Sequence, residues 1–157
     1  MKIALIILII VITLIVVMVL IGKMLPVKHI ASQSMSFQSS CDEVWKVVSN
    51  VNEWKSWRSD LKEITITGDS TVKADDVEYA ISNAVPGVSF TTTIITKDLP
   101  YGGAWNYVFE KDGSGCKLTI TENGEVYNPL FRFLSKFAFG HEGTLKKYME
   151  TLAKRMK

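Results

Sequence analysis

SSCDEVWKVVSNVNEWKSW, residues 39–57, contains the clearest local signals in the chain. Ser40 and Glu43 have the spacing of a capping box, in which each side chain accepts a hydrogen bond from the other residue's backbone amide at a helix start. Four valines follow at the spacing of one helix face: Val44, Val47, Val48 and Val51. Trp54 and Trp57 are three residues apart and share one face of a further turn. The stretch predicts two short helices that pack on a core.

Alternating polar and apolar residues on both sides of this stretch predict strands. Residues 27–38 carry apolar side chains on one face and serines on the other. Further alternating runs occupy 61–67, 77–82, 88–94, 105–109 and 118–120, and turn residues such as those at 112–115 separate them. We therefore expect a curled antiparallel sheet of about six strands.

Residues 128–156 predict one long C-terminal helix. Asn128 and Pro129 form a helix start, with asparagine as the cap and proline in the first turn. Apolar stripes precede and follow Gly140 and Gly143, which weaken the middle of the helix. A curled sheet around one helix leaves space where the helix carries small residues. The sequence therefore predicts an α+β fold with an apolar cavity between the sheet and this helix.

Residues 3–21, IALIILIIVITLIVVMVLI, contain no charged side chain. As a helix they would extend roughly 29 Å, which is close to the hydrocarbon thickness of a bilayer. A cleaved signal sequence is the alternative, but no small-x-small site follows the apolar run. The sequence favours a single-pass anchor over residues 1–25, which Pro26 ends, and a soluble domain over residues 26–157.

The sequence places the chain in the cell membrane but barely fixes its orientation. Lys2 and the α-amino group precede the apolar run, and Lys23 and Lys28 follow it, so the two sides balance. A short tail with two charges is costly to translocate. This consideration weakly favours an extracytoplasmic domain and makes the lipid bilayer a partner.

Composition excludes several classes of function. The 18 basic and 16 acidic residues give no strongly basic face, so we expect no nucleic-acid partner. Cys41 and Cys116 form no CxxC motif and have no metal-ligand spacing with histidine, so neither a metal nor a cofactor is expected. A disulfide would require export. The sequence favours two unpaired, buried cysteines.

Residues 39–45, then Trp54-Lys-Ser-Trp57 leading into Leu61, resemble the opening of the START-like superfamily, also called SRPBCC. This group includes polyketide cyclases, lipid-transfer domains and the birch pollen allergen fold, and many bacterial members have an N-terminal membrane anchor. The resemblance covers residues 27–156. It implies a helix-grip fold with a deep pocket for lipids, quinones, polyketides or similar molecules. Some members catalyse cyclisation or dehydration, and many are carriers.

We select candidate ligand-binding residues from the predicted sheet face, the tryptophan turn and the C-terminal helix. They are Trp54, Trp57, Tyr79, Phe90, Trp105, Tyr107, Phe137, His141 and Leu145. Each could instead be a core residue, because aromatic side chains suit both a core and a cavity wall.

His141 is the one candidate for a catalytic base, since it falls on the apolar stripe of the helix. A structural histidine is the more common alternative. We expect Glu122 to be exposed at a strand end, although it could pair with His141 if buried. His29 is expected in water beside the membrane, and Arg58 and Asp60 as a surface pair.

These features favour membrane-anchored binding or transport of an apolar small molecule. Few acid–base groups are predicted to line the pocket, so binding is favoured over catalysis. A cyclase or dehydratase that uses His141 is the first alternative. A protein-interaction module with a filled core is the second.

Overall fold

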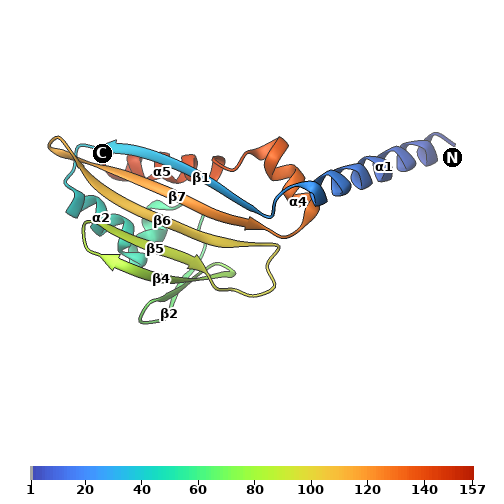
Figure 1. The fold of residues 1–157 in the computed structure, drawn as a ribbon. Coiled ribbons are helices and arrows are strands. Elements are labelled where there is room, and N and C mark those ends of the chain that lie inside the picture. The colour runs from blue at the N-terminus through green and yellow to red at the C-terminus, as the bar shows by residue number, and fades with distance from the viewer. Residues whose placement is uncertain (1) are drawn as a thin grey trace.

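The computed structural model describes residues 2–157, except the side chain of Phe139. Figure 1 shows one α+β domain from which a long N-terminal helix projects. The helical segments are α1 (Lys2–Met24), α2 (Cys41–Ser49), a 3₁₀ turn (Val51–Glu53), α3 (Trp54–Trp57), α4 (Pro129–Leu134), a π turn (Ser135–Phe139) and α5 (Gly143–Arg155).

The strands form one antiparallel sheet in the order β1-β7-β6-β5-β4-β3-β2. Their bounds are β1 (Lys28–Phe37), β2 (Ile64–Gly68), β3 (Thr71–Ala74), β4 (Val77–Val85), β5 (Ser89–Ile94), β6 (Tyr101–Asp112) and β7 (Gly115–Val126). The predicted fold class is confirmed, with seven strands instead of about six. The additional strand is β3, whose four residues are too few for an alternating pattern to be recognised.

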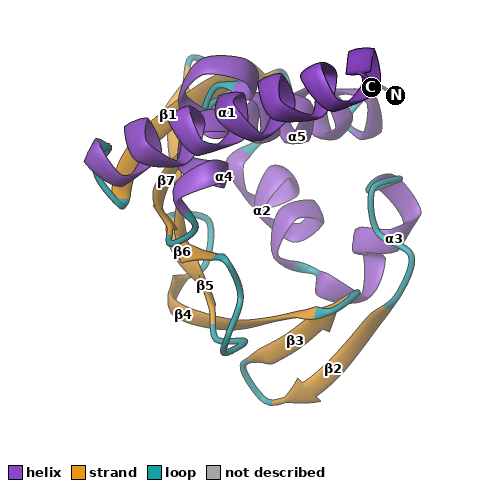
Figure 2. Cartoon of the chain, turned by 90° about the vertical axis from the view of Figure 1, so that its right-hand side faces the viewer, coloured by secondary structure: helices purple, strands orange, loops and turns teal. Residues whose placement is uncertain are grey.

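The capping box at α2 is present. The Ser40 backbone N–H donates to Glu43 Oε2 at 2.9 Å, and the Glu43 N–H donates to Ser40 Oγ at 3.4 Å. Val44 and Val48 are consequently held in the core with no exposed surface. Figure 2 shows how the sheet curves around α2, α3 and α5.

Helix α5 packs on the concave face of the sheet. Its buried side chains are Leu145, Tyr148, Met149 and Leu152. The sheet side chains in the same core include Phe90, Tyr107, Phe109, Leu118 and Ile120. The sheet and α5 therefore interdigitate tightly along the length of α5.

The C-terminal helix is not continuous, which corrects the sequence-based expectation. Asn128 caps α4 as predicted, since its Oδ1 accepts the amides of Leu130 and Phe131 at 2.9 and 3.2 Å. The segment then loosens into the π turn and stops at Gly140, whose φ of +71° lies in the left-handed region. Gly140 therefore ends the first helical segment, α5 begins at Gly143, and His141 lies in the break between them instead of on a helix face.

Cys41 and Cys116 form a disulfide between the start of α2 and β7, so the expectation of unpaired cysteines was wrong. No local pattern around Cys41 or Cys116 indicates that the two positions are neighbours. Their Cα atoms lie 4.8 Å apart because α2 packs across the ends of β6 and β7.

Helix α1 is exposed along most of its length, with Gly22 near its end buried, and its mean hydropathy is 3.7 in its most apolar window. Among the described residues it is the one helix long and apolar enough to cross a membrane. A membrane anchor and a signal sequence share this length and hydropathy.

We expect reduction of the disulfide to lower the free energy of unfolding by about 4 kcal/mol, because it closes a loop with a sequence separation of 75 residues. The measurement is urea unfolding of the full chain in detergent micelles, with and without dithiothreitol. The C41A/C116A variant is the control and should not respond to reductant. Identical unfolding curves for reduced and oxidised wild type would contradict this prediction.

Candidate functional site

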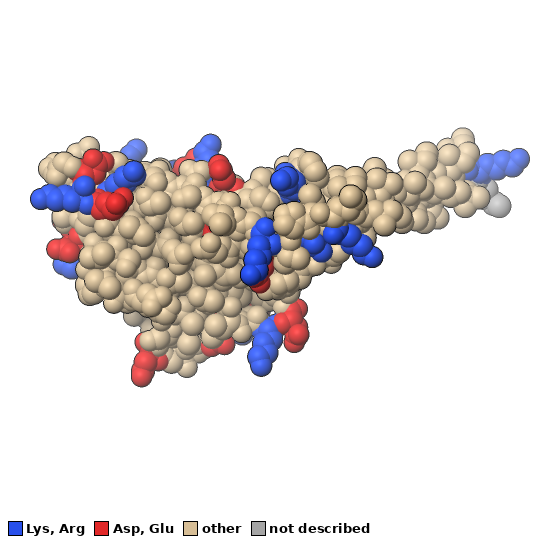
Figure 3. Space-filling model, in the orientation of Figure 1, with Lys and Arg blue, Asp and Glu red and all other residues tan. Residues whose placement is uncertain are grey.

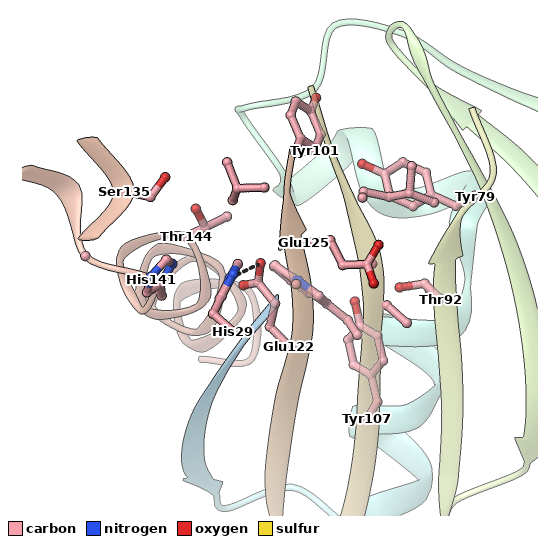
Figure 4. Close-up of a pocket in the computed structure, with 18 of the residues that line it drawn as sticks. His29, Tyr79, Thr92, Tyr101, Tyr107, Glu122, Glu125, Ser135, His141 and Thr144 are labelled. Atoms are coloured by element: carbon pink, nitrogen blue, oxygen red, sulfur yellow. Dashed lines mark ion pairs between the residues drawn. The ribbon is translucent and has the colours of Figure 1, made fainter. Parts of the chain in front are cut away.

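A cavity of about 420 Å³ lies where α5 no longer covers the sheet. Its walls come from the start of β1, the inner faces of β4 to β7, the residues around α3, and the segment from the π turn to the first turn of α5. Figure 4 shows these side chains converging from both sides of the space. The wall is mixed, with aromatic and aliphatic side chains interspersed with polar groups.

Two histidines and a glutamate form one polar group on this wall, which we name the His29 cluster. The His29 and His141 rings are stacked with centroids 3.8 Å apart. His29 Nε2 lies 3.4 Å from Glu122 Oε1, as the dashed line in Figure 4 marks. The side chains of His29 and Glu122 are only 15% and 21% exposed. Gly124 makes this possible, because a Cβ there would overlap the His29 ring.

Burial favours the neutral forms of all three groups. It lowers the pKa of His29. It also lowers the pKa of His141, with a further contribution from the neighbouring His29 that outweighs the opposing effect of Glu122. Burial raises the pKa of Glu122, and His141 and Trp105 offset only part of this increase. Both imidazoles are therefore neutral at neutral pH, and a neutral imidazole has one ring nitrogen that can accept a hydrogen bond or a proton.

A second polar group surrounds Arg58 directly after α3, and we name it the Arg58 cluster. Arg58 Nη2 donates to Asp60 Oδ2 at 2.8 Å. The guanidinium lies 5.5 Å from the Trp54 ring centroid and 5.4 Å from that of Tyr148, which is cation–π distance. The Arg58 side chain is 18% exposed and lines the cavity, so it is not the surface residue that we expected.

The hydroxyls near Arg58 are protonated donors. Burial raises the pKa of Tyr107 to about 12 and the pKa of Tyr148 well above 10. The pKa of Tyr79 is also raised by burial, although the charge on Arg58 opposes this increase. The pKa of Arg58 is itself raised, because its hydrogen bond to Asp60 and nearby charges outweigh the effect of burial.

The cavity lies at the end of the domain from which α1 emerges. Gly22 of α1 contacts the backbone of Pro129 at the start of α4, where a Cβ would overlap the Pro129 carbonyl. Arg132 of α4 donates to the Leu25 carbonyl at 2.8 Å and to the Tyr127 carbonyl at 3.4 Å. These contacts fix the end of α1 beside α4 and the end of β7.

The family model described as "Polyketide cyclase / dehydrase and lipid transport" matches residues 28–157. The chain belongs to this family. No match is found among curated proteins. The family and its START-like fold are associated with binding of hydrophobic ligands, and the cavity between the sheet and the C-terminal segment agrees with that role.

Solved structures share this fold at low sequence identity. A START superfamily protein from Mycobacterium smegmatis is 16% identical, with a TM-score of 0.67 over 82% of this chain and 97% of that chain. A conserved protein from Geobacillus kaustophilus is 15% identical, with a TM-score of 0.66 over 82% and 95%. Norcoclaurine synthase from Thalictrum flavum, in complex with dopamine and hydroxybenzaldehyde, is 13% identical, with a TM-score of 0.64 over 86% and 90%.

In this family member, the candidate residues selected from the sequence divide into three groups. The cavity wall includes Trp54, Tyr79, Trp105, Tyr107 and His141. The tightly packed core contains Trp57, Phe90 and Leu145. The Phe137 side chain is 61% exposed and lies outside the lining residues. Which of these residues bind a ligand stays a prediction.

Sequence reasoning missed three polar lining residues. His29 and Glu122 were expected in water, but the pairing of β1 with β7 sets His29 opposite Gly124 and brings the Glu122 carboxylate to its ring. Arg58 was expected at the surface, but it turns inward between two aromatic rings. The one sequence signal for this arrangement is Gly124, since a glycine in a strand can mark the close approach of another side chain, here the His29 ring. Among the described residues, no group of three or more His, Cys, Asp or Glu is suited to holding a metal ion.

We expect the H29Q/H141Q variant to gain thermal stability relative to wild type as the pH falls from about 7.5 to 5.5. Both histidines have a pKa below their ordinary 6.5 in the folded chain. The folded state therefore binds fewer protons than the unfolded state, and their contribution, present above about pH 6.5, is lost as the pH falls. Both rings are partly exposed, so a difference of a few degrees is expected.

The measurement is the melting temperature of the full chain in detergent micelles. The contribution of Glu122 to stability has the opposite pH dependence because its pKa is raised, but Glu122 is present in both the wild type and the variant. A constant difference in melting temperature across this pH range would contradict the prediction.

Proposed function

We propose that this chain is a membrane-anchored binding protein for an apolar small molecule, which its cavity exchanges with the adjacent bilayer. The observation that carries the proposal is the location of the cavity at the α1 end of the domain. Its volume of about 420 Å³ is in the usual range for small-molecule sites. A lipid, a quinone or a polyketide-like molecule would suit it.

Helix α1 supports the membrane part of this proposal. Its 23 residues would extend about 35 Å, enough to cross a bilayer. An apolar ligand partitions into lipid, so a cavity held at the membrane would have a short transfer path.

The surface around the end of α1 has the composition of a membrane interface. Exposed aromatic side chains are found there at Tyr127, Phe131 and Phe137. Basic side chains accompany them at Lys23, Lys28, Arg132 and Lys136. Figure 3 shows lysine and arginine side chains gathered where α1 joins the domain. This combination favours contact with acidic headgroups.

The disulfide supports an extracytoplasmic domain. Disulfides persist in oxidising compartments and are rare in the cytosol. The Cys41–Cys116 bond therefore favours export of the domain, with the N-terminus of α1 inside the cell. This agrees with the weak orientation preference drawn from the sequence.

The His29 cluster favours a second candidate function, an enzyme of the cyclase or dehydratase type. A neutral imidazole on a cavity wall can act as a general base, and His141 is half-buried beside His29 and Glu122. Once a substrate is identified, we expect His141→Ala to abolish its turnover without preventing substrate binding. The protein-interaction alternative depended on a filled core, and the cavity gives it no support.

Occupancy of the cavity tests the main proposal. The full chain is purified in digitonin, a detergent much larger than the cavity, and bound molecules are identified by native mass spectrometry and solvent extraction. Thr144→Trp places a bulky side chain on the cavity wall and should reduce retained ligand at least tenfold. Glu150→Trp introduces the same side chain at an exposed position of α5 outside the lining and is the matched control. No bound molecule in the wild type, or equal loss in both variants, would reject the proposal.

The contact between α1 and α4 provides a test of exchange with the membrane. Gly22→Val should displace α4 from α1, because even a Cβ overlaps Pro129. We expect unchanged ligand binding in micelles but slower ligand uptake from vesicles, by about threefold or more, in stopped-flow fluorescence. Leu20→Val, at an exposed position of the same helix, is the control. Equal uptake by the wild type and both variants would contradict a role for this contact.

A further inference from the structure

Hydrogen-bond donors without acceptors gather around Arg58, which lines the cavity, and in the core directly behind it. Of the buried side-chain atoms that have no hydrogen-bond partner in the described part of the chain, three belong to adjacent residues: Trp57 Nε1, Arg58 Nε and Tyr148 Oη. The Trp57 and Tyr148 rings are in edge contact at 5.3 Å, and the Arg58 guanidinium lies 5.4 Å from the Tyr148 ring. A buried donor without a partner is costly, so its retention calls for an explanation.

Arg58 and the neighbouring tyrosines form a site with a net excess of donors. A guanidinium has five N–H groups, and Asp60 accepts from Nη2 through a carboxylate that is itself 40% exposed. Tyr79 and Tyr107 line the same cavity, and their raised pKa values keep both hydroxyls protonated.

We propose that the Arg58 cluster is the head-group site of the cavity and that the ligand is an amphipathic acid, with an apolar body and a terminal carboxylate. This inference rests on the proposed function. A carboxylate supplies acceptors for the Arg58 guanidinium and for the hydroxyls of the lining residues Tyr79 and Tyr107 without further donors, and Arg favours carboxylates through its planar set of N–H groups.

The remaining charges orient such a ligand in one direction. Glu125 lines the cavity at the end of β7, and its carboxylate would repel a second carboxylate there. Glu125 is already engaged by Lys28 at 3.6 Å and by the Tyr127 hydroxyl at 2.6 Å. The head group therefore lies at Arg58, and the apolar body extends past Trp105 and Val126 toward the α1 end of the domain.

The test compares a fatty acid with its own methyl ester. The probe is cis-parinaric acid, an apolar polyene whose absorption overlaps tryptophan emission, so binding beside Trp54 and Trp105 is read as energy transfer. The full chain in digitonin should bind the acid about 10- to 100-fold more tightly than the ester, the usual effect of a charged hydrogen bond. Arg58→Met should remove this preference by weakening binding of the acid much more than binding of the ester.

Matched variants separate the head-group contact from general damage. Arg155→Met removes another arginine, which pairs at the surface with Glu53 at 3.7 Å, and should keep the preference for the acid. Arg58→Lys should retain part of it through its charge. Tyr107→Phe keeps the ring, removes one donor and should weaken acid binding alone by about 3- to 10-fold. Circular dichroism verifies folding, and Tyr107→Phe carries the test if Arg58→Met does not fold.

The outcomes distinguish this inference from the proposed function. One outcome is that the wild type binds the acid and the ester with equal affinity and that Thr144→Trp abolishes binding of both. This outcome would overturn the head-group site but would still support an apolar cavity. A preference for the acid that survives both Arg58→Met and Tyr107→Phe would also overturn it. Absence of cavity-dependent binding of either probe would reject the proposed function itself.

Discussion

A β-strand has a larger rise per residue than an α-helix, and the cavity results from this difference in length. A strand rises about 3.3 Å per residue and a helix 1.5 Å. The 12 residues each of β6 and β7 therefore extend about 40 Å, whereas the 13 residues of α5 extend about 20 Å. One helix of this length covers half of the concave face. The other half is left to α4, the π turn and the break at Gly140, which bridge the space without filling it.

The two halves of the concave face have different chemistry. Under α5, Leu145, Met149 and Leu152 interdigitate with sheet residues and exclude solvent. Polar groups border the cavity: the His29 cluster lies beside the break before α5, and the Arg58 cluster lies beside Tyr148 of α5. The fully buried apolar side chains of α5 all belong to the first half. The second half is consequently free to hold side chains whose burial is unfavourable on its own.

Local signals in the sequence predicted much of this fold. The capping box of α2, the Asn128–Pro129 start of α4 and the alternating strands involve residues that are near each other in the chain, so their patterns are visible without the tertiary structure. The glycines at 140 and 143 indicated a weak point in the C-terminal helix. They did not reveal a complete break, because that depends on the positive φ adopted by Gly140.

Features that depend on distant pairing could not be predicted. The stacking of His29 on His141 and the proximity of Cys41 to Cys116 both require the register of β1 and β7 and the position of α2 across the sheet. Arg58 appeared solvated because arginine usually is, and only the surrounding rings make its inward orientation favourable. Trp57, Phe90 and Leu145 were reasonable candidates as inward residues, but the packing of α5 and α3 on the sheet encloses them in the core, away from the cavity.

Only residues 25–27 separate α1 from β1, and Gly22 and Arg132 hold that junction against α4. With α1 embedded in lipid, this short junction would hold the domain at the membrane surface. A long flexible linker would instead allow the domain to move away from the membrane. Loading and unloading would then be confined to a thin layer at one leaflet, and the search for a guest would become a two-dimensional diffusion problem. Delivery across an aqueous gap would need a second, freely diffusing acceptor that comes to this domain.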